Sequence, residues 1–227
     1  MEIQKIINRP DTEQAWQLFV NHYIDVFTRA LIKLQQSESD IEYSINENIL
    51  SAKLAANFLK QACYELSIEQ HIQLCVPQWE RPIPPDDLQN LHNGQLGKRP
   101  DFTCVCPNRR PGSHENYEYY LNIECKLLGK RIENQKNYVV NGIQRFDDDH
   151  QYGKNALTGF MIGYLIGGEM ETLQKNVNKF IDTYTSEHKH LQISFNPSFI
   201  GQDSCSFKRK NVTPFDFTLV HIWVDLR

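Results

Sequence analysis

The stretch "YYLNIECKLL", Tyr119 to Leu128, decides the expected fold. Its apolar residues alternate with polar ones, and this period of two places the two sets on opposite faces of a β-strand. Glu124 and Lys126 share the polar face, and another strand-like run, "PDFTCVC", opens at Pro100-Asp101. The pattern therefore leaves two interpretations: an exposed pair on an ordinary sheet surface, or an active site that holds a metal ion.

The flanking sequence predicts an α/β fold with a mixed sheet covered by helices. Apolar residues recur at helical spacing from Asp11 to about Gln35 and from about Ser44 to Tyr64, and again in 132–146 and 170–184. A proline-rich surface loop is expected over 76–99. Strands are expected at 71–76, 101–106, 119–128, 158–168, 191–195 and 216–226.

Composition predicts a soluble, cytoplasmic protein. Of the 227 residues, 40% are hydrophobic and 23% are charged, as in ordinary globular domains, and no apolar run approaches the about 20 residues of a membrane span. The N-terminal segment shows no secretion signal. The spacing of the six cysteines favours buried structural thiols over a zinc site. The net charge of −4 argues against tight binding of nucleic acid by charge alone.

The strand pattern predicts how the charged residues would act together. If the two strands are neighbours, Asp101 and Glu124 converge, and a divalent cation relieves the repulsion between their carboxylates. Oxygen ligands favour magnesium or manganese, with the backbone carbonyl of Cys125 as a further ligand. Lys126 faces the same side as Glu124, where it would hold an attacking hydroxide or stabilise charge on a phosphate.

These motifs resemble the PD-(D/E)xK nuclease superfamily, which has the restriction-endonuclease fold. Pro100-Asp101 matches the PD element, and Glu124-Cys125-Lys126 matches the E-x-K element. The resemblance implies one domain over 1–227, with a helical extension at 1–40 and a catalytic core at 41–227. The superfamily usually adds a glutamate from a preceding helix, and Glu42 fits that position better than Glu47 does.

The resemblance extends to nucleases of bacterial anti-phage defence loci, in which a Tyr, a Gly-Ile and an Arg-Phe follow the E-x-K strand. The matching positions are Tyr138, Gly142, Arg145 and Tyr152. It implies a magnesium-dependent endonuclease that cuts DNA, in which Asp101, Glu124, Lys126 and Glu42 are catalytic. DNA is preferred to RNA because most relatives cut DNA.

Several polar residues leave alternatives open. Arg145, Tyr138 and Lys130 are candidates for nucleic-acid contacts, although Arg145 is equally well explained as a helix-end cation. Asp147-Asp148-Asp149 is typical of a solvated loop. Lys208-Arg209-Lys210 is expected in an exposed turn that would be free to contact a nucleic-acid backbone. The histidines at 71, 150 and 221 stand at unconnected positions and are not expected to bind metal.

An uncontrolled nuclease would damage its own cell, so we expect a partner. The candidates are a larger sensor or ATPase subunit, or a second copy of this chain, and the apolar stripe of the first helix would pack on its own domain or dock on such a partner. The alternative function is that of a binding or scaffold subunit which keeps the nuclease fold without catalysis. An unrelated α/β interaction protein is the third possibility.

Overall fold

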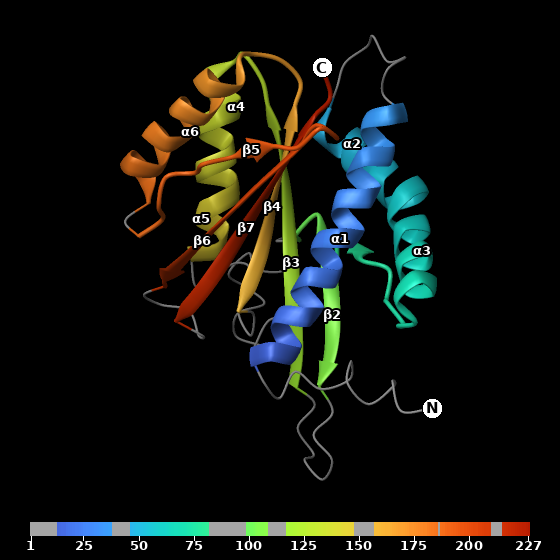
Figure 1. The fold of residues 1–227 in the computed structure, drawn as a ribbon. Coiled ribbons are helices and arrows are strands. Elements are labelled where there is room, and N and C mark those ends of the chain that lie inside the picture. Colours follow the sequence, from blue (N-terminus) through green and yellow to red (C-terminus); the bar gives the residue numbers. More distant parts are fainter. Residues whose placement is uncertain are drawn as a thin grey trace.

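A computed structural model describes residues 13–37, 46–81, 99–108, 117–147, 157–185, 187–209 and 215–227. Its centre is a seven-stranded sheet in the order β1-β2-β3-β4-β7-β6-β5 (Figure 1). The strands are β1 (Gln78–Trp79), β2 (Phe102–Asn108), β3 (Tyr117–Leu128), β4 (Thr158–Leu165), β5 (Ser194–Phe195), β6 (Ile200–Lys208) and β7 (Asp216–Asp225).

The sheet combines a parallel centre with antiparallel flanks. Strand β4 lies parallel to β3 and to β7, whereas the β1–β2, β2–β3, β6–β7 and β5–β6 pairs are antiparallel. Parallel neighbours require crossover connections, and helices supply them here. All eight residues of β4 are buried, as its continuous apolar run predicts for a central strand covered on both faces. The expected mixed α/β arrangement is confirmed.

The first helical layer consists of α1 (Glu13–Ser37) and one long helix that comprises α2 (Glu47–Lys53), the π-helical segment η3 (Leu54–Leu59) and α3 (Lys60–Gln70). Asn46 caps this second helix, because its side chain accepts a hydrogen bond from the Asn48 N–H. The apolar stripe of α1 packs on its own sheet, which was the simpler of the two expectations. Trp16 Nε1 donates to Thr158 Oγ1 on β4 at 3.0 Å within this layer.

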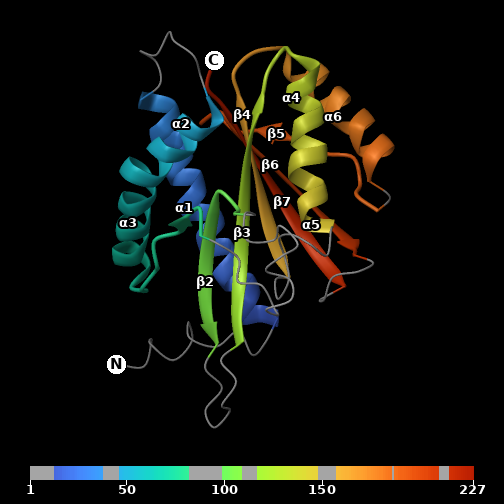
Figure 2. The same cartoon turned by 180° about the vertical axis from the view of Figure 1, so that it is seen from behind.

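The second layer covers the opposite face of the sheet (Figure 2). It consists of α4 (Ile132–Tyr138), the π-helical segment η6 (Val139–Ile143), α5 (Gln144–Asp147) and α6 (Met170–Tyr184). Its core residues meet Met161 on β4 and Leu219 and Trp223 on β7. None of the described helices has the length and apolar character that crossing a membrane requires.

Three sequence expectations for the strands were wrong or incomplete. No strand forms at 71–76, because its backbone groups bond to helix side chains: Tyr23 Oη donates to the Cys75 carbonyl, and the Leu74 N–H donates to Ser67 Oγ. The strand expected at 191–195 is limited to Ser194–Phe195. Strand β6 was missed, since its Gly, Asp and Ser residues hide a strand that exists through its pairing with β7.

Candidate active site

The candidate site lies at a fork in the sheet, where β3 continues beyond its last pair with β2, Phe102 with Ile123. The amides of Cys125 and Leu127 face this fork, and carboxylates take the place of a strand. Asp101 Oδ2 accepts the Cys125 N–H at 2.6 Å, and Glu47 Oε2 accepts the Leu127 N–H at 3.2 Å. The backbone of β3 therefore holds both acidic side chains in position.

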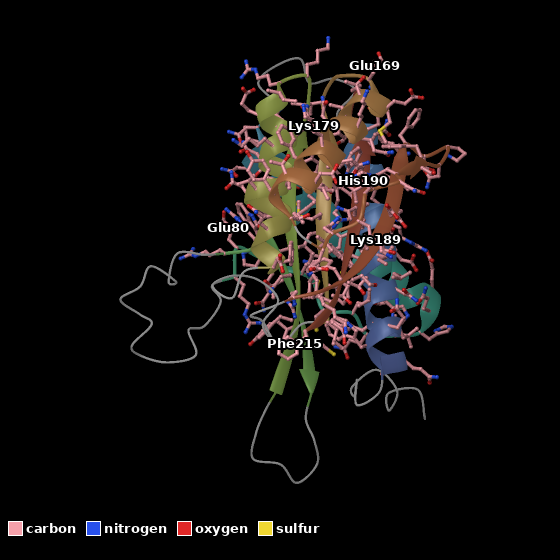
Figure 3. All side chains as sticks on the ribbon, turned by 90° about the vertical axis from the view of Figure 1, so that its left-hand side faces the viewer. Glu80, Glu169, Lys179, Lys189, His190 and Phe215 are labelled. Carbon is pink, nitrogen blue, oxygen red and sulfur yellow. The ribbon has the colours of Figure 1, made fainter. Side chains whose placement is uncertain are left out.

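Local sequence explains how these carboxylates reach the fork. Asp101 directly precedes β2, and Glu47 is the first residue of α2 after the Asn46 cap. Strand β1 fixes the entry to β2, because the Glu80 N–H donates to the Asp101 carbonyl at 3.0 Å; Figure 3 labels Glu80. Both acidic residues stand at element boundaries, where a side chain points past the end of regular structure toward the site.

Glu124 and Lys126 are buried together on the second face, with 2% and 7% of their surfaces exposed. The interpretation of an exposed surface pair is therefore wrong. Lys126 Nζ lies 2.7 Å from Glu124 Oε1, 2.9 Å from Glu47 Oε1 and 2.8 Å from the Cys125 carbonyl. These contacts use all three N–H groups of the ammonium. The site thus surrounds one buried cation with oxygen atoms.

A second cation reaches the same carboxylate from the helix layer. Arg145 Nη1 lies 2.5 Å from Glu124 Oε1. The helix approaches closely because Gly142 has no side chain: a Cβ there would lie 2.4 Å from Met161 Cε and 3.5 Å from Lys126 Cγ. Arg145 is therefore part of the site and is more than a helix-end cation.

The other oxygen of Glu124 is the unusual atom of the site. Glu124 Oε2 is buried and has no hydrogen-bond partner among the described residues, although Oε1 contacts two cations. Leaving a carboxylate oxygen without water or a donor is costly, so such an atom indicates a missing ligand. A divalent cation at Oε2 would remove that cost.

Burial controls the protonation of the site. Burial raises the pKa of Asp101 to about 6, against the opposing effects of Lys126 and the Cys125 N–H. Burial likewise raises the pKa of Glu124 to about 7; Lys126 opposes this shift, and Asp101 adds to it. Burial alone would lower the pKa of Lys126, but Glu124, Glu47 and Asp101 together raise it above the ordinary lysine value. Lys126 therefore stays charged at neutral pH.

The residues present fit a hydrated magnesium or manganese ion. Asp101, Glu124 and Glu47 are opposed by only Lys126 and Arg145, so ionised carboxylates outnumber cations. The part of the chain that the structure describes contains no group of three or more His, Cys, Asp or Glu arranged as metal ligands. Magnesium does not require one, since it commonly binds through one or two carboxylates and keeps several waters. The Cys125 carbonyl would become a ligand only if Lys126 moved.

The remaining predicted residues fare differently. Tyr138 is completely buried, so its prediction as a nucleic-acid contact is wrong. Lys130 is exposed on the connection between β3 and α4. Arg209 is buried with its guanidinium 4.2 Å from the ring centroid of Phe217, so the expected exposed turn is wrong at that residue. Glu42, Tyr152, Asp148, Asp149 and Lys210 lie outside the described residues.

Sequence reasoning ranked one site residue too low. Glu42 was preferred to Glu47, yet Glu47 is the glutamate that contacts Lys126. The available signal was the position of Glu47 immediately after Asn46, a good N-cap residue, at the start of a helix. The cysteines agree better with expectation: all six are free thiols, and only Cys75 is exposed.

Comparison of the chain with protein-family models, curated proteins and solved structures finds no match. The chemistry of the site is therefore argued from its own residues. The likeness of Pro100-Asp101 and Glu124-Cys125-Lys126 to the nuclease motifs stays a prediction.

Proposed function

We propose that this protein is a magnesium- or manganese-dependent nuclease that hydrolyses phosphodiester bonds in DNA. One observation carries the proposal: Asp101, Glu124 and Lys126 meet at the fork of β2 and β3, and Glu124 Oε2 is buried without a hydrogen-bond partner among the described residues. Strand order adds support, because the acidic pair comes from two antiparallel neighbours followed by a helix and a parallel strand, as the resemblance implies.

Asp101 and Glu124 would hold the cation, which supplies an activated water and stabilises charge on the phosphate. Glu124 would bind through Oε2, because Lys126 and Arg145 already contact Oε1. Asp101 would bind while the Cys125 N–H keeps its carboxylate oriented. The two protein cations thus lie on the side of Glu124 away from the proposed metal position.

Lys126 has a different role from a general base. Because its raised pKa keeps it charged, Lys126 would donate hydrogen bonds to the attacking hydroxide or to a phosphate oxygen. Its present acceptors, Glu124 and Glu47, hold the ammonium beside the cation site. Arg145, which is less buried than Lys126, would extend the positive charge toward the substrate.

The second candidate function is a binding or scaffold subunit without catalysis. It is favoured by the way in which Lys126 already uses all its hydrogen-bond donors within the site. A buried ammonium that satisfies the carboxylates reduces the need for a metal. A scaffold of this kind would bind its partner equally well with and without magnesium.

Plasmid degradation tests the proposal. Wild type should cut DNA with magnesium or manganese and stop when the metal is chelated, and Glu124→Gln should lose about 100-fold or more of the rate. Glu69→Gln is the matched control, because Glu69 is an exposed residue on α3 that pairs with Arg29. Equal rates in wild type and Glu124→Gln, or cleavage without any metal, would exclude the proposed mechanism.

We further propose that the active form is an assembly with a sensor or ATPase subunit, or a homodimer. The net charge of −4 supports this proposal, since the chain alone should bind a duplex weakly and with strong salt dependence. The apolar face of α1 is used within the chain, so α1 does not provide the docking surface. Light scattering of the pure protein and co-purification with proteins encoded nearby test this point.

A further inference from the structure

A chain of buried hydrogen bonds crosses the second face of the sheet, away from the fork. Trp223 Nε1 donates to Tyr138 Oη at 2.9 Å, and Tyr138 Oη lies 2.8 Å from His221 Nδ1. His221 Nε2 lies 3.1 Å from His188 Nε2, and His188 Nδ1 lies 2.6 Å from the Lys189 carbonyl. Figure 3 shows Lys189 on the side of the molecule away from Glu80, which marks the edge near the fork. The proposed nuclease chemistry uses none of these groups.

The two ends of this chain fix the direction of every hydrogen bond. A carbonyl only accepts, so His188 Nδ1 carries the proton and His188 Nε2 accepts from the N–H at His221 Nε2. Neutral His221 then accepts at Nδ1, and its donor is the hydroxyl of Tyr138. The indole of Trp223, which can only donate, completes the pattern on the Tyr138 oxygen. A proton added to either imidazole would set two N–H groups against each other.

The chain ends at the helix that carries Arg145. Tyr138 is the last residue of α4 and is followed by the π-helical segment η6, and Arg145 comes seven residues after Tyr138. In a regular α-helix residues seven apart lie on one stripe. The wider π turn holds an extra residue, which displaces later side chains by about 100° around the axis. This displacement allows Tyr138 to face β7 while Arg145 faces β3.

Two contacts therefore hold the helix across three strands. Glu124 on β3, Met161 on β4 and His221 on β7 form one row in the register, so the two ends of the row lie about 10 Å apart. Tyr138 fastens the helix at His221, and Arg145 fastens it at Glu124. A helix held at only one of these points would be free to rotate on the surface of Met161, where Gly142 rests.

We propose that the Tyr138 hydroxyl, oriented by His221 and His188, is a positioning group that sets Arg145 on Glu124. The proposal deepens the nuclease function and rests on it for any effect on catalysis, whereas its structural part stands independently. Tyr138, His221 and His188 touch no reacting atom, so they would act through Arg145 and not as catalytic residues.

The charged and titratable neighbours of the histidine pair are compatible with neutral imidazoles. Asp203 on β6 is the register partner of His221, Lys189 lies next to His188, and Cys205 accepts the Lys189 N–H. Burial lowers the pKa of His188 despite Asp203, and burial together with His188 lowers the pKa of His221. The relay is therefore intact at neutral pH and breaks in acid.

Nitrogen-15 NMR of the imidazoles tests the relay in wild-type protein. At pH 7.5 we expect His221 to carry its proton on Nε2 and His188 to carry its proton on Nδ1. Charged imidazoles, or the opposite tautomer at either residue, would overturn the proposal whether or not the protein cuts DNA.

A comparison of variants tests the coupling to the site. The carbon-13 signal of the Glu124 carboxyl is titrated in wild type, Arg145→Gln, Tyr138→Phe and Tyr23→Phe. Removing Arg145 should raise the pKa of Glu124, and Tyr138→Phe should shift it in the same direction, with about a 10-fold fall in kcat and little change in KM. Tyr23→Phe is the matched control, since Tyr23 is equally buried and its hydroxyl bonds only to the distant Cys75 carbonyl.

The outcomes separate this inference from the proposed function. A Glu124 titration that shifts in Arg145→Gln but not in Tyr138→Phe would refute the positioning role. Absence of cleavage by wild type, together with coupled titrations, would refute the nuclease and leave the positioning role intact. If Tyr138→Phe fails to fold, His188→Asn tests the same coupling from the other end of the relay.

Discussion

Arg145 and Lys126 share a single oxygen of Glu124, with Arg145 Nη1 at 2.5 Å and Lys126 Nζ at 2.7 Å from Oε1. The neighbouring Oε2 is left buried without a partner among the described residues. This asymmetry divides the carboxylate into one oxygen for protein cations and one that suits a metal ion. The division makes the site open to direct tests.

Replacing Lys126 by Met should destabilise the metal-free protein as well as abolish cleavage. The substitution leaves Glu124 and Glu47 without their shared ammonium, and removal of one partner from a buried ion pair costs about 3 kcal/mol or more. The sequence alone suggested that variants at this strand surface would keep their stability, but the burial of Lys126 changes that expectation. Thermal unfolding at pH 7.5 and pH 5.5 measures the effect, which should shrink at the lower pH because the carboxylates become protonated.

Manganese should stabilise the protein more at pH 8 than at pH 6. The raised pKa values of Asp101, about 6, and Glu124, about 7, favour the folded state at low pH, and this stability is lost as pH rises through those values. A bound cation compensates the charge that then develops. The increase in Tm on adding manganese should therefore grow between pH 6 and pH 8. Asp101→Asn should weaken this growth; an increase in Tm independent of pH would show that the metal binds elsewhere.

Acid should weaken the histidine relay independently of the carboxylates. His188 and His221 have pKa values below the ordinary 6.5, so their contribution to stability is fully present above about pH 6.5 and declines as pH falls further. Chemical unfolding between pH 7.5 and pH 5 should show a smaller loss in His188→Asn than in wild type. Identical pH dependence in both proteins would mean that the imidazoles do not titrate on unfolding as expected.

Glu47 and Glu42 are distinguished by a paired substitution. Glu47→Gln should reduce cleavage by about 10-fold or more, because Glu47 holds both Lys126 and the Leu127 N–H. If Glu47 is the glutamate that matters, Glu42→Gln should retain nearly full activity. A plasmid assay on the two variants decides between them, and a larger loss in Glu42→Gln would restore the original preference from sequence.

Much of the fold was predictable because its signals are local. The apolar run of β4, the alternation in β3 and the helical spacing in α1 and α6 each report burial directly. Strand β6 was not predictable in this way, since its polar residues form a strand through pairing with β7. The segment 71–76 failed for the opposite reason: its alternation is real, but helix side chains satisfy its backbone.

The candidate site was predictable only where its residues lie on adjacent strands. Asp101, Glu124 and Lys126 could be placed together from strand order, because neighbouring strands bring their faces together. The contact of Arg145 with Glu124 depends on a π turn, and that of His221 with His188 depends on a return of the chain 33 residues earlier. Spacing along the sequence carries no information on either contact.

Binding of manganese, measured by electron paramagnetic resonance at pH 7.5, tests the central claim most directly, because it requires neither a partner subunit nor the right DNA. We expect one site in wild type and in the control Glu69→Gln, and loss of that site in both Asp101→Asn and Glu124→Gln. Absence of binding in wild type, or equal binding in wild type and Glu124→Gln, would contradict the assignment of these carboxylates as metal ligands.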